Sequence, residues 1–103
     1  MATFQRVAAV TDLPPGKSMA VQVGGQKIAL FNVGGTFYAI GDTCTHRGGP
    51  LSEGTIEGTT VICPWHGACF ELGSGKNLTP PAPAAVPAYR VRIEGTDLQV
   101  EIS

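Results

Sequence analysis

The sequence predicts an all-β fold of small antiparallel sheets, with a segment rich in potential metal ligands inserted between two strand-rich flanks. Fourteen Gly and eight Pro divide the 103 residues into short runs. None of these runs carries a sustained apolar period of 3.6 residues, so the helix signal is weak. The runs are rich in Val, Ile, Phe and Tyr, which favour strands. The length fits one domain with a modest core.

Seven runs have the composition of strands. Pairs of Gly lie between consecutive runs at 24–25 and 34–35, where tight hairpins need φ > 0, and the 94–97 segment has a similar turn composition. The order of the runs therefore predicts a meander of hairpins. The runs are Phe4 to Val10, Met19 to Val23, Lys27 to Val33, Thr36 to Ile40, Thr59 to Ile62, Ala88 to Glu94 and Leu98 to Ile102.

Alternation of apolar and polar residues is clearest near the C-terminus. Tyr89, Val91 and Ile93 share one face of the predicted strand, and the charged residues between them take the other. Leu98 and Val100 repeat the pattern in the next run. These strands are expected to have one face in the core and one in water.

The segment from Gly41 to about Asn77 interrupts the regular pattern. It is loop-like and holds every Cys and His of the chain. Within it, residues 55–62 resemble a hairpin that turns near Glu57 and Gly58. The stretch TPPAPAAVP at 79–87 is expected to be extended and stiff, either as a connector across the sheet or as a rigid wall beside the metal-binding loops.

The net charge of −1, with 15% charged residues, gives no electrostatic basis for binding nucleic acid or an anionic membrane. No stretch is long and apolar enough for a membrane span, and residues 1–20 do not resemble a secretory signal. We therefore expect a cytoplasmic protein. In a reducing compartment, three cysteines favour metal binding over disulfides.

Two short motifs hold both His and two of the three Cys. They are CTHRGG at 44–49, with Cys44 and His46, and CPWHGA at 63–68, with Cys63 and His66. The predicted hairpin between them would bring the second loop back beside the first, so four ligands could converge. Zinc accepts this donor set, but its common spacings pair Cys with Cys and His with His, whereas each pair here is mixed. A chance pattern and an iron–sulfur site are the other interpretations.

The segments CTHRGGPL and CPWHGACF closely resemble the two cluster-binding boxes of Rieske proteins, and the likeness covers nearly the whole chain. The resemblance implies a [2Fe-2S] cluster in which Cys44 and Cys63 bind one iron and His46 and His66 bind the other. It also implies a single Rieske domain over residues 1–103. Base sheets would span about 1–41 and 78–103, with a cluster-binding subdomain at about 42–77.

The same resemblance bears on the reduction potential. High-potential Rieske proteins have a disulfide at the positions of Gly49 and Trp65, and hydroxyl donors at those of Ala68 and Phe70. Hydrogen bonds to the cluster sulfurs raise the potential. Their loss predicts a midpoint in the lower third of the range of about −150 to +300 mV. Cys69 is expected to have no redox role.

Rieske ferredoxins shuttle single electrons from a flavin-containing NAD(P)H reductase to a terminal oxygenase, and the resemblance implies this role here. Docking would be transient, at the edge formed by His46 and His66. No further His remains for an active site, so we expect an electron-transfer component that is not itself an enzyme. The sequence has no heptad pattern or obvious apolar stripe, so we expect a monomer. The alternatives are a small Rieske subunit of an assimilatory nitrite reductase and a zinc-stabilised interaction module.

Overall fold

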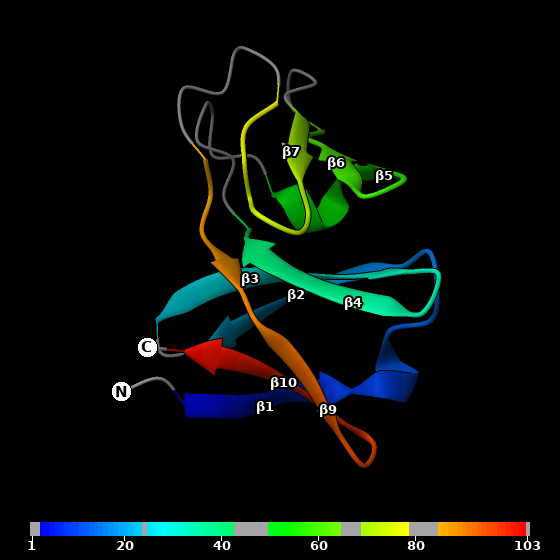
Figure 1. Ribbon diagram of the computed structural model, residues 1–103, viewed down its shortest axis with the longest axis vertical. Coiled ribbons are helices and arrows are strands. Elements are labelled where there is room, and N and C mark those ends of the chain that lie inside the picture. Colours follow the sequence, from blue (N-terminus) through cyan, green and yellow to red (C-terminus); the bar gives the residue numbers. More distant parts are fainter. Residues whose placement is uncertain (1–2, 24, 43–49, 65–68, 79–84, 103) are drawn as a thin grey trace.

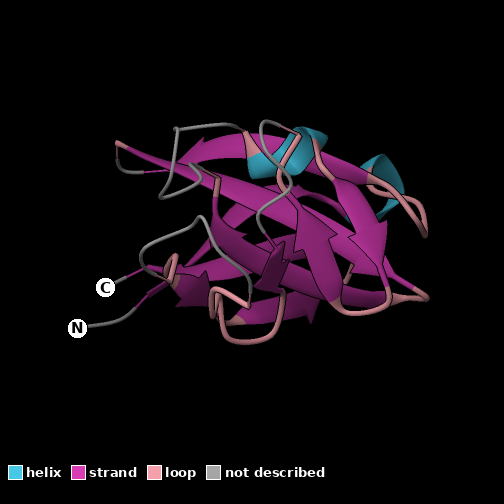
Figure 2. Cartoon of the chain, turned by 90° about the horizontal axis from the view of Figure 1, so that it is seen from above, coloured by secondary structure: helices cyan, strands magenta, loops and turns pink. Residues whose placement is uncertain are grey.

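The computed structural model describes residues 3–23, 25–42, 50–64, 69–78 and 85–102. Strands make up nearly all of the regular structure in this part of the chain, with two short 3-10 turns (Figure 2). The elements in order are β1 (Thr3–Ala9), η1 (Val10–Asp12), β2 (Ser18–Val23), β3 (Gln26–Val33), β4 (Thr36–Gly41), η2 (Leu51–Glu53), β5 (Thr55–Glu57), β6 (Thr60–Ile62), β7 (Cys69–Glu71), β8 (Ala88–Tyr89), β9 (Val91–Glu94) and β10 (Asp97–Ile102).

The strands form three antiparallel sheets stacked along the long axis of the molecule (Figure 1). The first sheet has the order β1-β10-β9, the middle sheet β2-β3-β4-β8, and the third β5-β6-β7. The first and third sheets lie at opposite ends in Figure 1, with the middle sheet between them. The predicted all-β class is confirmed.

Strand β3 is buried on both faces because the middle sheet has a core on each side. Ile28 and Leu30 pack in one apolar cluster with Leu98 and Val100 from β10. Ala29 and Phe31 pack in a second cluster, which includes residues from η2, β6 and β7. A strand that is covered on both faces has apolar residues at consecutive positions instead of alternating ones, and β3 shows this pattern.

The predicted meander is confirmed in β2-β3-β4, which are joined by two hairpins. At the second hairpin Val33 pairs with Thr36, so the connection consists only of Gly34 and Gly35. Their φ angles are 60° and 95°. A two-residue hairpin of this type needs positive φ at both positions, which side chains rarely allow.

The prediction of one continuous strand over 88–94 is wrong. The chain changes sheets at Arg90: Tyr89 pairs with Ala39 in the middle sheet, and Val91 pairs with Val100 in the first. Ile93, expected in the core, is 52% exposed. It lies on the edge strand β9, one residue before the pair Glu94–Asp97 that closes the β9–β10 turn.

The description of 41–77 as loop-like is also wrong for the residues that the structure describes. They include η2 and the three short strands of the third sheet. Leu51, Val61, Phe70 and Leu72 from this segment are almost completely buried. The strands have three residues each, which is too short for alternation to be recognised, and β7 was not predicted at all.

Candidate metal centre

Of the four predicted ligands, the structure describes Cys63. Cys44 and His46 fall within 43–49 and His66 falls within 65–68, outside the described residues. The same holds for Gly49, Trp65, Ala68 and most of the Pro-rich stretch. What the structure shows is the frame from which the two ligand-bearing loops extend.

Cys63 directly follows the last residue of β6 and is 3% exposed. It belongs to the apolar cluster that also contains Phe31 and Phe70. An ionised thiolate is costly in such surroundings unless a partner charge compensates it. A bound metal ion supplies that compensation, so the position is suited to a ligand on the inner side of a metal site.

The second motif forms the connection of a β-hairpin. Ile62 in β6 pairs with Cys69 in β7, so residues 63–68 join the paired ends of the two strands. Cys63 is the first residue of this connection. The backbone N–H of Leu78 donates to the carbonyl oxygen of Cys69 at 2.8 Å, which ties the chain after β7 to the same place.

The first motif lies in a loop whose two ends are bonded to each other. The backbone N–H of Leu51 donates to the carbonyl oxygen of Asp42 at 2.7 Å. The backbone N–H of Ser52 donates to the Asp42 carboxylate at 2.7 Å. Residues 43–50, with Cys44 and His46 among them, are thus closed at their base.

The bases of the two loops lie side by side. Thr55 pairs with Ile62, and a Cβ on Gly54 would overlap the Ile62 carbonyl oxygen. Leu51, where the first loop ends, shares an apolar cluster with Cys63, where the second begins. The predicted hairpin over 55–62 is confirmed, and it is the element that brings these two ends together.

The available donors fit an asymmetric two-iron cluster. Two thiolates and two neutral imidazoles around two ferric ions and two sulfides sum to zero charge, which favours uptake of one electron. The buried Cys63 matches the thiolate end of such a centre. In the described part of the chain, no three Cys, His, Asp or Glu side chains gather to form another metal site.

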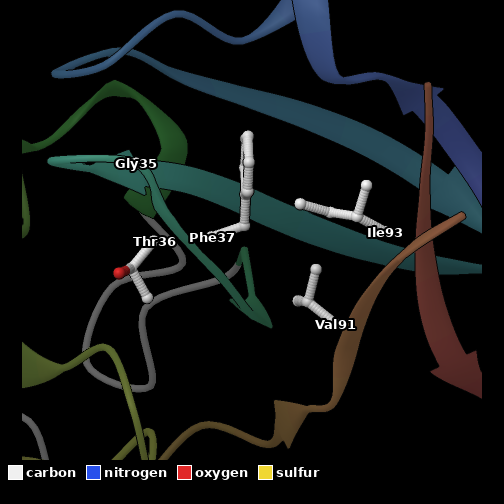
Figure 3. Close-up of a pocket in the computed structure, with 5 residues that line it drawn as sticks. All are labelled: Gly35, Thr36, Phe37, Val91 and Ile93. Carbon is white, nitrogen blue, oxygen red and sulfur yellow. The ribbon is translucent and has the colours of Figure 1, made fainter. Parts of the chain in front are cut away.

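A separate depression lies between the β3–β4 turn and β9, among uncharged residues (Figure 3). The side chains of Phe37, Val91 and Ile93 project towards the same space, with Gly35 and Thr36 at its rim. None of these residues is a Cys, His or carboxylate, so the depression is not a metal centre.

A small β frame with two adjacent loop bases, from which motifs that each pair one Cys with one His continue, suits an iron–sulfur electron-transfer protein. Residues 3–90 match the family model of the Rieske [2Fe-2S] domain. The chain belongs to this family. It therefore carries a [2Fe-2S] cluster.

The similar curated proteins are ferredoxin subunits of dioxygenases. The biphenyl dioxygenase ferredoxin subunit of Pseudomonas sp. (strain KKS102) is 40% identical over 102 residues, covering 98% of this chain and 94% of that protein. The 3-phenylpropionate/cinnamic acid dioxygenase ferredoxin subunit of Escherichia coli (strain K12) is 44% identical over 94 residues, covering 90% and 88%. Ferredoxin subunits carry electrons, so this chain is an electron-transfer component and not itself an enzyme.

Solved structures support the same assignment. The ferredoxin of carbazole 1,9a-dioxygenase from Nocardioides aromaticivorans IC177 has a TM-score of 0.90 at 31% identity, covering 95% of this chain and 96% of that one. A complex of reduced oxygenase and oxidized ferredoxin in carbazole 1,9a-dioxygenase contains a chain with a TM-score of 0.86 at 35% identity, covering 94% and 91%.

The two alternatives from the sequence have less support. A putative NADH-dependent nitrite reductase small subunit from Mycobacterium tuberculosis has a TM-score of 0.90 but 24% identity, with 100% of this chain and 97% of that chain covered, which shows a shared fold alone. The match to the Rieske family model favours an iron–sulfur protein over a zinc-stabilised module. In the described residues, no helix is long and apolar enough to cross a membrane.

Sequence reasoning missed Asp42, although its backbone and its carboxylate both hold the base of the first loop. The sequence did contain a signal. Asp42 comes just after the predicted strand Thr36 to Ile40, and two residues before the predicted ligand Cys44. The contact between Gly54 and Ile62 was missed as well. This contact depends on how two segments approach each other in space, which no local sequence pattern predicts.

Proposed function

We propose that this protein is a low-potential Rieske ferredoxin that takes single electrons from a flavin-containing NAD(P)H reductase and delivers them to a terminal oxygenase. The observation that carries the proposal is its near full-length similarity to dioxygenase ferredoxin subunits, at 40% identity over 98% of the chain. The similarity to a ferredoxin chain found in a complex with its oxygenase supports the acceptor.

We propose Cys44, His46, Cys63 and His66 as the cluster ligands, with the thiolates on one iron and the imidazoles on the other. When bound, the cluster accepts and returns one electron. The burial of Cys63 supports thiolates on the inner side of the centre. The adjacency of the two loop bases supports ligands from both motifs on one cluster.

Electron exchange with both partners would use the edge formed by His46 and His66. Cys63 is covered by the core around Phe31, so its side of the centre is closed to a partner protein. Electron-carrier encounters use small, transient interfaces, which suits a carrier that must leave one partner to reach the next. We propose that the carrier acts as a cytoplasmic monomer.

The low potential follows from the residues that replace hydroxyl donors. Phe70 is fully buried in the same apolar cluster as Cys63, and its ring has no donor for a sulfur atom. Without such a donor the reduced cluster, which carries the added negative charge, is less stabilised. The midpoint potential is therefore lower than in proteins that keep the hydroxyl groups.

We propose that residues 1–103 form one domain, with base sheets over about 1–41 and 78–103 and a cluster-binding part over about 42–77. The three-sheet arrangement supports this division, since β5, β6 and β7 hydrogen-bond only among themselves within the described strands. The apolar cluster that joins Phe31 to Leu51, Val61 and Phe70 attaches the cluster-binding part to the middle sheet.

The test is metal analysis followed by reconstituted electron transfer. Protein purified without oxygen should contain iron and acid-labile sulfide and, once reduced, give an EPR signal with an average g below 2. It should also restore NADH-dependent product formation to a biphenyl dioxygenase system lacking its own ferredoxin. Absence of iron and sulfide would refute the proposal.

A matched pair of variants tests the ligand assignment. Cys63→Ser removes a proposed ligand, whereas Cys69→Ser makes the same change six residues away at the other end of the hairpin connection. Cluster loss in the first variant and retention in the second is the expected result. Retention in Cys63→Ser would refute the assignment of that residue.

A further inference from the structure

Asp42 is a fully buried acidic residue at the point where the middle sheet meets the first ligand-bearing loop. It directly follows the last residue of β4 and is 1% exposed. A buried carboxylate is costly unless hydrogen bonds and an opposite charge compensate it. The contacts of Asp42 provide both.

Four interactions join Asp42 to three residues, and we call this set the Asp42 clamp. Its backbone N–H donates to the carbonyl oxygen of Lys27 at 3.0 Å, and its own carbonyl oxygen accepts from the Leu51 N–H at 2.7 Å. Carboxylate oxygen Oδ1 accepts from the Ser52 N–H at 2.7 Å. Oxygen Oδ2 lies 3.5 Å from Lys27 Nζ.

The clamp holds the two ends of the segment 43–50. Leu51 and Ser52 are themselves buried in η2, so the loop returns to a fixed place in the core. The Ser18 hydroxyl donates to the Ser52 carbonyl oxygen, which adds a link to β2. Hydrogen bonds to an ionised acceptor are stronger than those between neutral groups, so the carboxylate contributes strongly to closure.

Chain connectivity keeps Asp42 close to the first proposed ligand. Cys44 is two residues after Asp42, and consecutive Cα atoms are about 3.8 Å apart, so the two Cα atoms lie within about 7.6 Å of each other. Reduction of a cluster adds negative charge. A fixed negative charge near the cluster, in a buried and weakly screened position, opposes that addition.

Lys27 compensates the carboxylate only in part. Its side chain is 59% exposed and its ammonium group lies 3.5 Å from the carboxylate. Water screens the charge of an exposed ammonium group, so Lys27 neutralises only part of the Asp42 charge. The rest acts on the groups around Asp42.

We propose that Asp42 is a positioning and potential-tuning residue for the cluster. It clamps the loop that carries Cys44 and His46, and its buried negative charge lowers the midpoint potential, with Lys27 offsetting part of that effect. The inference rests on the proposed function, specifically on Cys44 and His46 as ligands.

Two substitutions at position 42 separate the clamp from the charge. Asp42→Asn keeps an oxygen that can accept from the Ser52 N–H but removes the charge. Asp42→Ala removes both. Lys27→Gln removes the partial counter-charge from an exposed position, where the change has little effect on folding.

The matched control is Asp97→Asn. Asp97 pairs with Arg6 at 2.8 Å, with the two side chains 41% and 57% exposed. It starts β10 in the first sheet, at the opposite end of the molecule from the third sheet (Figure 1). The substitution changes the net charge by the same amount, so it measures the effect of overall charge on the potential.

The measurements are iron content, midpoint potential by voltammetry, and hydrogen exchange at the Leu51 and Ser52 amides. Asp42→Asn should keep its iron and show a positive shift in midpoint potential larger than that of Asp97→Asn. Lys27→Gln should show a negative shift. Asp42→Ala should lose iron, and its Ser52 amide should exchange about tenfold faster or more.

Equal shifts in Asp42→Asn and Asp97→Asn, or no shift in Lys27→Gln, would overturn the tuning role. Unchanged iron content and amide exchange in Asp42→Ala would overturn the clamp. Wild-type protein without iron and acid-labile sulfide, or a Cys44→Ser variant that keeps its cluster, would instead refute the proposed function on which the inference rests.

Discussion

The carbonyl oxygen of Ile62 occupies the space in which residue 54 would carry a Cβ, so only glycine fits at Gly54. This contact holds the end of η2 against the end of β6. It therefore fixes the separation between the two ligand-bearing loops, whose bases lie a few residues from these positions. The spacing of the bases of the two loops that hold the proposed ligands depends on this approach of two backbones.

Gly54→Ala should weaken both the fold and cluster binding. The added methyl group meets backbone atoms that cannot rotate away, and overpacking of this kind costs about 1 to 3 kcal/mol in free energy of unfolding. Urea unfolding and iron content are the measurements. Gly73→Ala is the control, because the nearest atoms to its Cβ lie at 4.0 Å. Equal effects from the two substitutions would contradict the argument.

The wild-type midpoint potential near neutral pH should fall in the lower third of the range of about −150 to +300 mV. Phe70→Tyr should shift it to more positive values, because the new hydroxyl stands where high-potential relatives have a donor. Voltammetry on the two proteins checks both statements. A clearly positive wild-type value would reject the low-potential assignment. A tyrosine variant with an unchanged potential would show that position 70 does not reach a sulfur atom.

His66→Ala should lose the cluster and reduce hydrogen-exchange protection in β5, β6 and β7. Metal binding orders loops that otherwise lack a large core. Loss of the metal should therefore reduce order first around the site. Protection in β1, β9 and β10 should persist, because these strands pack in the other apolar cluster with Leu98 and Val100. Equal loss of protection throughout would mean that the two parts do not open separately.

Phe31→Ala should destabilise both parts together. The side chain is fully buried in the cluster that joins the middle sheet to residues of the third sheet. Removing a buried Phe costs about 3 to 5 kcal/mol in free energy of unfolding. Denaturant unfolding should show this loss together with reduced iron content. Phe37→Ala, at a partly buried position in the other cluster, should lose less of both. A Phe31 variant that kept full iron content would show that the middle sheet does not support the metal loops.

Local sequence was enough to predict most strands, because composition and turn glycines act within a few residues. The Gly34–Gly35 turn is an example: two adjacent residues with positive φ define the hairpin and its register. The ligand motifs are local too, since Cys63 and His66 are separated by two residues. Residue spacing together with family resemblance was therefore sufficient to predict the cluster and the all-β class.

Other features arise only when distant segments meet. The sheet change at Arg90 depends on β4 and β10 each offering a pairing edge, and the alternation of the segment contains no sign of it. Asp42 is one of eight acidic residues in the sequence, and its importance comes from the amides of Leu51 and Ser52 that face it. The sequence by itself predicted the candidate iron ligands and most of the strands. Only the tertiary structure decided how the loop bases are held together, because those contacts join residues far apart along the chain.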